Sequence, residues 1–144
     1  MDLDLRTLKT ILPPLQADFY VDEEMAIKAV HAGSAFNIID REYIYKLDIF
    51  ILGNDILSVT EMNRRVRYTI AESGNQSIYL CTPEDIIAHK LYWFKLGGEV
   101  SERQWSDARN VIKVQGRRLD MEYLRSTCAG RGVENLLERL LTSG

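Results

Sequence analysis

The ten residues from Tyr43 to Leu52, YIYKLDIFIL, constrain the fold more than any other stretch of the chain. They are rich in β-branched and aromatic side chains, and apolar residues recur at every second position, which is typical of a β-strand. Because successive side chains of a strand point to opposite faces, two sets are expected: Tyr45, Leu47, Ile49 and Ile51 on one face, and Lys46, Asp48, Phe50 and Leu52 on the other. We predict that this stretch is the central strand of a sheet.

Asp48 lies in the middle of this predicted strand. Burying an unpaired carboxylate costs roughly several kcal/mol, so the position needs an explanation. Asp48 either pairs with a cation, such as Lys46 on the same face, or opens onto a site. The strand by itself leaves both interpretations open.

Composition narrows the class of protein. A chain of 144 residues suits one domain with a hydrophobic core, and its net charge of −3 gives no basic field for bulk electrostatic binding of nucleic acid. No apolar run approaches the ~20 residues of a bilayer span, and the acidic start MDLDLR is no signal peptide. Cys81 and Cys128 lie far apart and only two histidines are present, so we expect reduced thiols, no zinc site and a cytoplasmic protein without a membrane partner.

The order of predicted elements indicates an α+β fold. Short strands and turns run up to residue 81, and Phe36 to Ile39 is expected to pair with the central strand as a hairpin. Asp22 is expected to cap one helix within this part. From Thr82 onward four helices follow one another, and the capping residues Thr82, Ser101 and Asp120 begin the first three. We therefore predict a single domain over residues 1–144, with one mixed sheet in 1–81 and a helical segment in 82–144. Pro13-Pro14 is expected to stop an early helix.

Acidic residues also alternate at the start of the chain. In an extended Met1 to Leu5, Asp2 and Asp4 would share one face, although a solvated, frayed terminus explains them equally. Together with Asp48, they could form a group of three carboxylates on neighbouring strands. Such a group commonly holds one or two Mg²⁺ ions against a nucleoside triphosphate, so these acids are candidate catalytic residues and metal ligands.

The cationic counterpart would come from Arg64, Arg65 and Lys90, whose side chains could meet phosphate oxygens. The alternatives are structural: Lys90 as a solvated lysine and Arg65 as a charge on an edge strand.

Several segments, in this order, resemble the nucleotidyltransferase superfamily: FYVD (19–22), FNIID (36–40), KLDIF (46–50), NRR (63–65), TPEDIIAHKL (82–91), ERQWSDARNVIKVQG (102–116) and LDMEYL (119–124). The likeness is to a small bacterial branch related to abortive-infection toxins and aminoglycoside-modifying members. It implies a nucleotidyltransferase sheet, with Asp48 as the third acid. It also implies that Lys90 meets phosphate and that Asp107 belongs to the nucleotide-side helices.

The chain departs from the family pattern in two ways. It has no Gly-Gly or Gly-Ser turn upstream of the acids, so the helix start that would cradle phosphate is missing. In one interpretation, Asp2 and Asp4 are the family's pair of acids. In the other, they are the Asp-Leu sequence that follows a few residues after that pair in the family's pattern, and the pair itself is missing.

Three functions remain open. The first is magnesium-dependent transfer of a nucleoside monophosphate from a triphosphate to an unidentified acceptor. The second is a truncated or inactive relative that binds and regulates another chain, as in toxin–antitoxin pairs, or forms a homo-oligomer. The third is an active protein that is longer than this sequence because of a misplaced start.

Overall fold

The computed structural model describes residues 4–53, 55–70 and 76–142. Internal contacts divide the chain into two compact units, Met1–Ser58 and Val59–Gly144. Helices and antiparallel strands occur in both units, which confirms the α+β class. The prediction of a single nucleotidyltransferase-like domain stays a prediction.

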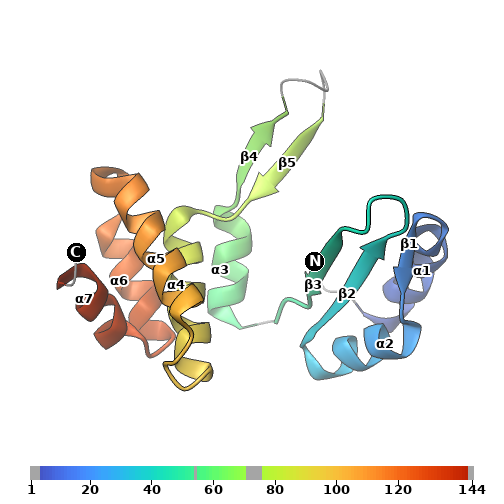
Figure 1. The fold of residues 1–144 in the computed structure, drawn as a ribbon, viewed down its shortest axis with the longest axis horizontal. Helices are drawn as coiled ribbons and strands as arrows, with labels where there is room; N and C mark the ends of the chain where they lie inside the picture. Colours follow the sequence, from blue (N-terminus) through green and yellow to red (C-terminus); the bar gives the residue numbers. More distant parts are fainter. Residues whose placement is uncertain (1–3, 54, 71–75, 143–144) are drawn as a thin grey trace. The chain divides into compact units, whose positions relative to one another are not determined.

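The N-terminal unit packs two helices on one face of a three-stranded sheet (Figure 1). The strands are antiparallel, in the order β1-β2-β3. The elements are α1 (Leu5–Asp18), β1 (Phe19–Val21), α2 (Glu23–Ala32), β2 (Ala35–Asp40) and β3 (Lys46–Phe50). The buried side chains come from both helices and from the helix-facing side of the sheet: Leu8, Leu12, Val21, Ala26, Ala29, Phe36 and Ile38.

Helix α1 corrects two expectations about the N-terminus. Asp4 has an extended backbone but acts as the N-cap of this helix, and Leu5 already belongs to the helix, so the predicted extended stretch does not reach Leu5. The helix also continues through Pro13 and Pro14. An internal proline costs about 3 kcal/mol through its missing N–H and its clash with the preceding turn. Leu8 and Leu12 are fully or almost fully buried, which contributes about 1.5–3 kcal/mol each. Tertiary packing of this leucine stripe therefore offsets the prolines.

The predicted central strand is shorter than expected and lies at the sheet edge. β3 covers Lys46–Phe50, and β2 is the central strand. The strand cannot extend back to Tyr43 because Ile44 has a left-handed backbone (φ 60°) and the Asp40 carboxylate accepts hydrogen bonds from the N–H groups of Glu42 and Tyr43. The turn, rather than the alternation of side chains, sets where β3 begins.

The alternation within β3 itself is confirmed. Leu47 and Ile49 pair with Ile38 and Phe36, both buried on the helix-covered face of the sheet. Asp48 pairs with the exposed Asn37. Since directly paired residues share a face, Asp48 and its neighbours Lys46 and Phe50 lie on the face that α1 and α2 do not cover.

The C-terminal unit is a helical bundle from which a hairpin extends (Figure 1). Its elements are β4 (Val66–Thr69), β5 (Ser77–Leu80), α4 (Pro83–Leu96), α5 (Glu102–Gln115), a 3-10 helix η2 (Gly116–Arg118), α6 (Met121–Gly130) and α7 (Glu134–Thr142). Helix α3 (Ile56–Arg64) precedes the hairpin. The core combines apolar side chains of α4 to α7: Ile87, Ala88, Leu91, Phe94, Ala108, Leu119, Leu124, Cys128, Val133, Leu136, Leu137 and Leu140.

The strands that the structure describes form two antiparallel sheets, β1-β2-β3 and β4-β5, where one mixed sheet was expected. Both β2–β3 and β4–β5 are sequential strands, and short connections allow only antiparallel pairing. Within the described part of the chain, no helix has the length and apolar content that a membrane span requires.

Candidate functional site

Asp48 is both paired and accessible on the open face of the β1-β2-β3 sheet. Its Oδ1 lies 3.3 Å from Lys46 Nζ, and about half of each side chain is exposed (53% and 58%). The first interpretation left open by the sequence, pairing with Lys46, is therefore confirmed, and both groups are exposed to solvent. The second interpretation, that Asp48 opens onto a site, stays a prediction. An exposed ion pair of this kind contributes little to stability, so the carboxylate is free to exchange its partner.

The second described acid, Asp4, has a structural role. Its Oδ1 accepts a hydrogen bond from the N–H of Thr7 at 2.7 Å, as a helix N-cap does, and this bond lowers the pKa of the Asp4 carboxyl. Asp4 also lines an open groove of about 920 Å³, together with His31 and Gly53. Asp2, the third predicted acid, lies outside the described residues.

Those acids do not form a metal-binding group with other side chains in the described part of the chain. Among the residues described, no three His, Cys, Asp or Glu side chains converge in a way that could hold a metal ion. In the register of β2 and β3, the position directly opposite Asp48 is Asn37, on the same face of the sheet.

Magnesium binding at Asp48 stays a prediction. Mg²⁺ is usually held by one or two carboxylates and by substrate phosphates, while several waters stay in its shell. The Asp48 carboxylate and the Asn37 amide oxygen are hard oxygen donors on one solvent-exposed face. They would hold the ion from the sheet side, and the bound ion would supply charge neutralisation of the phosphates.

The predicted phosphate-binding cations are engaged by protein groups in the C-terminal unit. Lys90 Nζ lies 2.9 Å from Asp107 Oδ2 and joins α4 to α5, and this hydrogen bond lowers the pKa of the Asp107 carboxyl. The Arg64 guanidinium stacks 3.6 Å from the centre of the Tyr123 ring. Arg65 donates to the carbonyl of Met62. A role in nucleotide binding stays a prediction for all four predicted residues.

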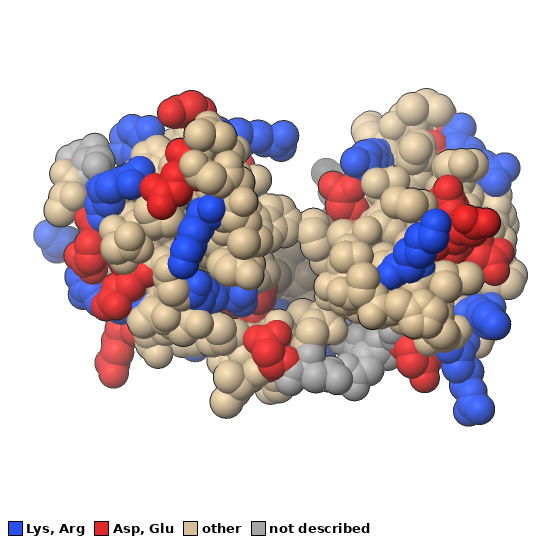
Figure 2. Space-filling view, turned by 90° about the horizontal axis from the view of Figure 1, so that it is seen from below, with Lys and Arg blue, Asp and Glu red and all other residues tan. Residues whose placement is uncertain are grey.

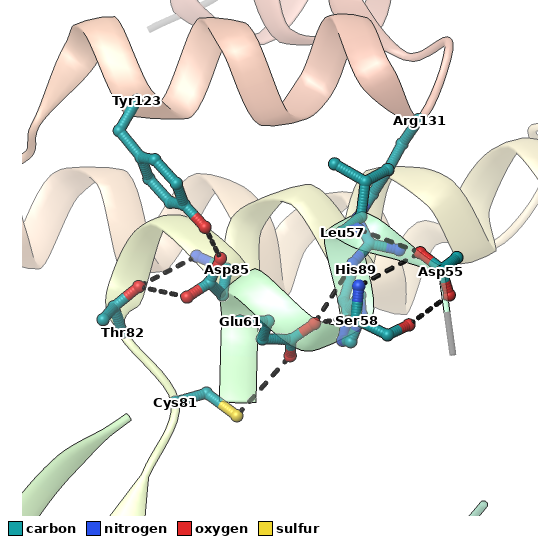
Figure 3. Close-up of polar contacts among 10 residues, drawn as sticks. All are labelled: Asp55, Leu57, Ser58, Glu61, Cys81, Thr82, Asp85, His89, Tyr123 and Arg131. Atoms are coloured by element: carbon teal, nitrogen blue, oxygen red, sulfur yellow. Dashed lines mark hydrogen bonds and ion pairs between the residues drawn. The ribbon is translucent and has the colours of Figure 1, made fainter. Parts of the chain in front are cut away.

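Sequence reasoning missed a buried polar cluster around Glu61 (Figure 3). The Glu61 side chain is only 8% exposed, and its Oε2 lies 3.1 Å from both His89 Nε2 and Arg131 Nη2. Its Oε1 accepts a long hydrogen bond from Cys81 Sγ at 3.6 Å. The cluster joins α3 to α4 and to the end of α6. No local motif marks Glu61, because its partner Arg131 lies 70 residues away.

A second buried carboxylate, Asp85, begins α4 (Figure 3). It accepts hydrogen bonds from the hydroxyls of Thr82 and Tyr123, both at 2.6 Å. Burial, and then the hydrogen bond to Asp85, raises the pKa of the Tyr123 hydroxyl. The sequence did mark this position as an acid in the first helical turn, but not as a buried one. The bond to Tyr123 ties the start of α4 to α6.

Neither cluster has an activated nucleophile. Burial, and then the Glu61 charge, raises the pKa of the Cys81 thiol, so it stays protonated at neutral pH. His89 lies against Glu61 and stacks with Trp93 at 6.3 Å between ring centres. These contacts stabilise the bundle, and Asp48 remains the better candidate for chemistry.

Comparison with known proteins finds no match for this chain, either among family models or among curated proteins and solved structures.

Proposed function

We propose that this protein binds a magnesium-bound nucleoside triphosphate on the open face of its β1-β2-β3 sheet. It would transfer the nucleoside monophosphate to a hydroxyl acceptor, so that a phosphoester bond forms, the bond between the α- and β-phosphates breaks, and pyrophosphate leaves. The observation that carries the proposal is the exposed Asp48 carboxylate, which faces solvent opposite Asn37 and beside Lys46. The likeness of segments such as KLDIF to nucleotidyltransferases assigns the same residue to the metal. Chemical reasoning and family resemblance therefore point to one side chain.

In this proposal Asp48 and Asn37 orient the metal-bound phosphates, and Lys46 neutralises negative charge. Lys46 now offsets the charge of Asp48, and a bound divalent cation would take over that task. Lys46 would then be released to donate to a phosphate oxygen. Charges of both signs are mixed on the face of each unit that Figure 2 shows, which suits a local anion site better than a broad anionic partner.

The test is calorimetric titration with ATP, GTP, CTP and UTP, each with and without Mg²⁺. We expect at least one triphosphate to bind below millimolar Kd only when Mg²⁺ is present, and Asp48→Asn to weaken it at least about tenfold. Glu24→Gln is the matched control, since Glu24 is an exposed carboxylate 3.6 Å from Lys28 on the same unit. If no triphosphate binds below millimolar Kd, or if the two variants behave alike, the proposal is wrong.

A second candidate is a non-catalytic relative that binds another chain. It is favoured by the structural use of the described acids, since Asp4 caps α1 and Asp48 pairs with Lys46. Such a protein would bind its partner without magnesium or nucleotide. A purified monomer that releases pyrophosphate from a triphosphate, and loses this activity in Asp48→Asn, would exclude this second candidate.

A further inference from the structure

Strand β3 is the outer strand of the β1-β2-β3 sheet (Figure 1), and every second residue turns its backbone groups away from β2. The N–H of Asp40 donates to the carbonyl of Tyr45 at 2.8 Å, which places Tyr45 in a hydrogen-bonded pair of the two strands. Hydrogen-bonded and non-hydrogen-bonded pairs alternate along an antiparallel ladder, so the odd-numbered residues of β3 bond to β2. The N–H and C=O groups of Lys46 and Asp48 therefore point outward, in the plane of the sheet.

An outward edge of this kind is a template for another strand. In the described part of the chain, β2 is the only strand that pairs with β3. Leu47, between the two charged residues, is 47% exposed although it lies on the helix-covered side of the sheet. Proteins commonly protect an edge with a lysine, because two copies of the edge then bring like charges together. Lys46 alone would have this effect, but Asp48 follows it two residues later.

The order of the charges along β3 makes its edge complementary to a second copy of itself. Outward groups belong to even-numbered residues, so two antiparallel copies must pair even-numbered residues with each other. A two-fold axis at Lys46 or at Asp48 would set two like charges opposite each other, and an axis at Ile49 would set Asp48 opposite the apolar Phe50. An axis at Leu47 sets Lys46 of each copy opposite Asp48 of the other. Opposite charges in directly paired positions stabilise a sheet, whereas like charges there destabilise it.

The ion pair within one chain leaves both charges available to the second copy. Lys46 and Asp48 are two residues apart on one strand, a backbone separation of about 6.6–6.8 Å, and both side chains are about half exposed. Residues directly opposite each other on paired strands have Cβ atoms only about 4.5–5.5 Å apart. Each carboxylate would therefore gain a closer ammonium group from the other copy, and neither charge has to leave water completely.

We propose that two copies of the chain pair edge to edge through β3, antiparallel and with a two-fold axis at Leu47, so that their two sheets become one continuous sheet. Lys46 of each copy exchanges backbone hydrogen bonds with Asp48 of the other, and the two Leu47 side chains pack together. The contact is small compared with the ~800 Å² per partner of a standard interface, so the dimer forms at micromolar rather than nanomolar concentrations. The new bonds lie in the plane of the sheet, so the open face stays uncovered and the dimer does not depend on nucleotide binding.

Charge reversal, followed by sedimentation velocity of the full chain between about 1 and 300 µM without nucleotide or Mg²⁺, tests this pairing. Lys46→Asp sets two carboxylates opposite each other and Asp48→Lys sets two ammonium groups opposite each other, so each should weaken the dimer at least about tenfold. An equimolar mixture of these two variants should form a heterodimer as tightly as wild type forms its dimer, and the double variant Lys46→Asp/Asp48→Lys should form a homodimer again. Lys28→Asp is the matched control, since it makes the same charge change at an exposed lysine of the same unit.

The recovery of pairing separates a second copy from any other partner. A monomer at every concentration overturns the proposal, and so does a weakened dimer that neither the mixture nor the double variant restores. Equal weakening by Lys28→Asp overturns it as well, because the effect would then follow net charge rather than the β3 edge. Amide hydrogen exchange of the wild-type chain gives a measurement that needs no variant: protection of the Lys46 and Asp48 amides should rise with concentration, and unchanged protection contradicts the pairing.

Discussion

Arg131 Nη2 lies 3.1 Å from Glu61 Oε2 and joins the end of α6 to α3 in the buried part of the C-terminal unit. The pair Arg125–Glu138, between α6 and α7, has the same nitrogen–oxygen distance. The two pairs differ in burial, since the Arg131 and Glu61 side chains are 11% and 8% exposed, against 52% and 50% for Arg125 and Glu138. The chain thus contains a buried ion pair and a matched exposed one.

Replacing the two glutamates should have unequal effects on stability. Glu61→Ala leaves a buried guanidinium without its carboxylate and should lower the free energy of unfolding by about 3 kcal/mol at pH 7. Glu138→Ala removes an exposed pair and should cost less than about 1 kcal/mol. Urea denaturation measures both values. The double variant Glu61→Ala/Arg131→Met should lose less than the sum of its single variants. Equal losses for the two glutamates would contradict the structural role of Glu61.

The bond between Tyr123 and Asp85 predicts a dependence of stability on alkaline pH. The pKa of the Tyr123 hydroxyl is raised in the folded chain, by burial first and then by Asp85. The folded state therefore keeps a proton that the unfolded state releases above about pH 10. This contribution to stability is complete below pH 10 and is lost as pH rises through the folded pKa.

Tyr123→Phe removes the hydroxyl and should cost about 2 kcal/mol at pH 7, because a buried carboxylate loses a donor. The difference in unfolding free energy between wild type and variant should shrink as pH rises from 9 to about 11.5. Urea denaturation across this range checks the trend, and the remaining tyrosines contribute equally to both proteins. A difference that stays constant or grows with pH would show that Tyr123 is not held by Asp85.

The two cysteines should react very differently with a thiol reagent such as DTNB. Burial raises the pKa of the Cys128 thiol to about 12, so Cys128 should react only after unfolding. Cys81 is exposed, but burial of its thiol and the Glu61 charge raise its pKa too, so it should react more slowly than a free thiol. Glu61→Gln should accelerate it. Comparable rates for Cys81 and Cys128 in the folded chain would be inconsistent with the described core.

Local chemistry made the helix starts predictable. Asp22, Thr82, Ser101 and Asp120 each accept a hydrogen bond from a backbone N–H three residues later, as their positions before helical segments predicted. The strand pair β2–β3 and the two faces of β3 followed in the same way from alternation and a polar turn. These features depend on residues that are close together in the sequence, so local patterns are enough to predict them.

Features that depend on distant residues escaped prediction. Helix α1 runs through Pro13 and Pro14 because Leu8 and Leu12 are buried in the core of the N-terminal unit, a tertiary effect that outweighs propensity. The edge position of β3 follows from the strand order, which periodicity does not encode. The burial of Glu61 depends on Arg131, which lies far along the chain, so no pattern of neighbouring residues marks it.

Metal binding at Asp48 is the claim on which the proposed function depends most, and Mn²⁺ in place of Mg²⁺ tests it by nuclear magnetic resonance. With a nucleoside triphosphate present, paramagnetic broadening should be strongest at the amides of Asn37 and Asp48 and should disappear in Asp48→Asn but not in Glu24→Gln. Broadening that is absent from β2 and β3, or that persists in Asp48→Asn, would contradict a metal-bound nucleotide on this sheet.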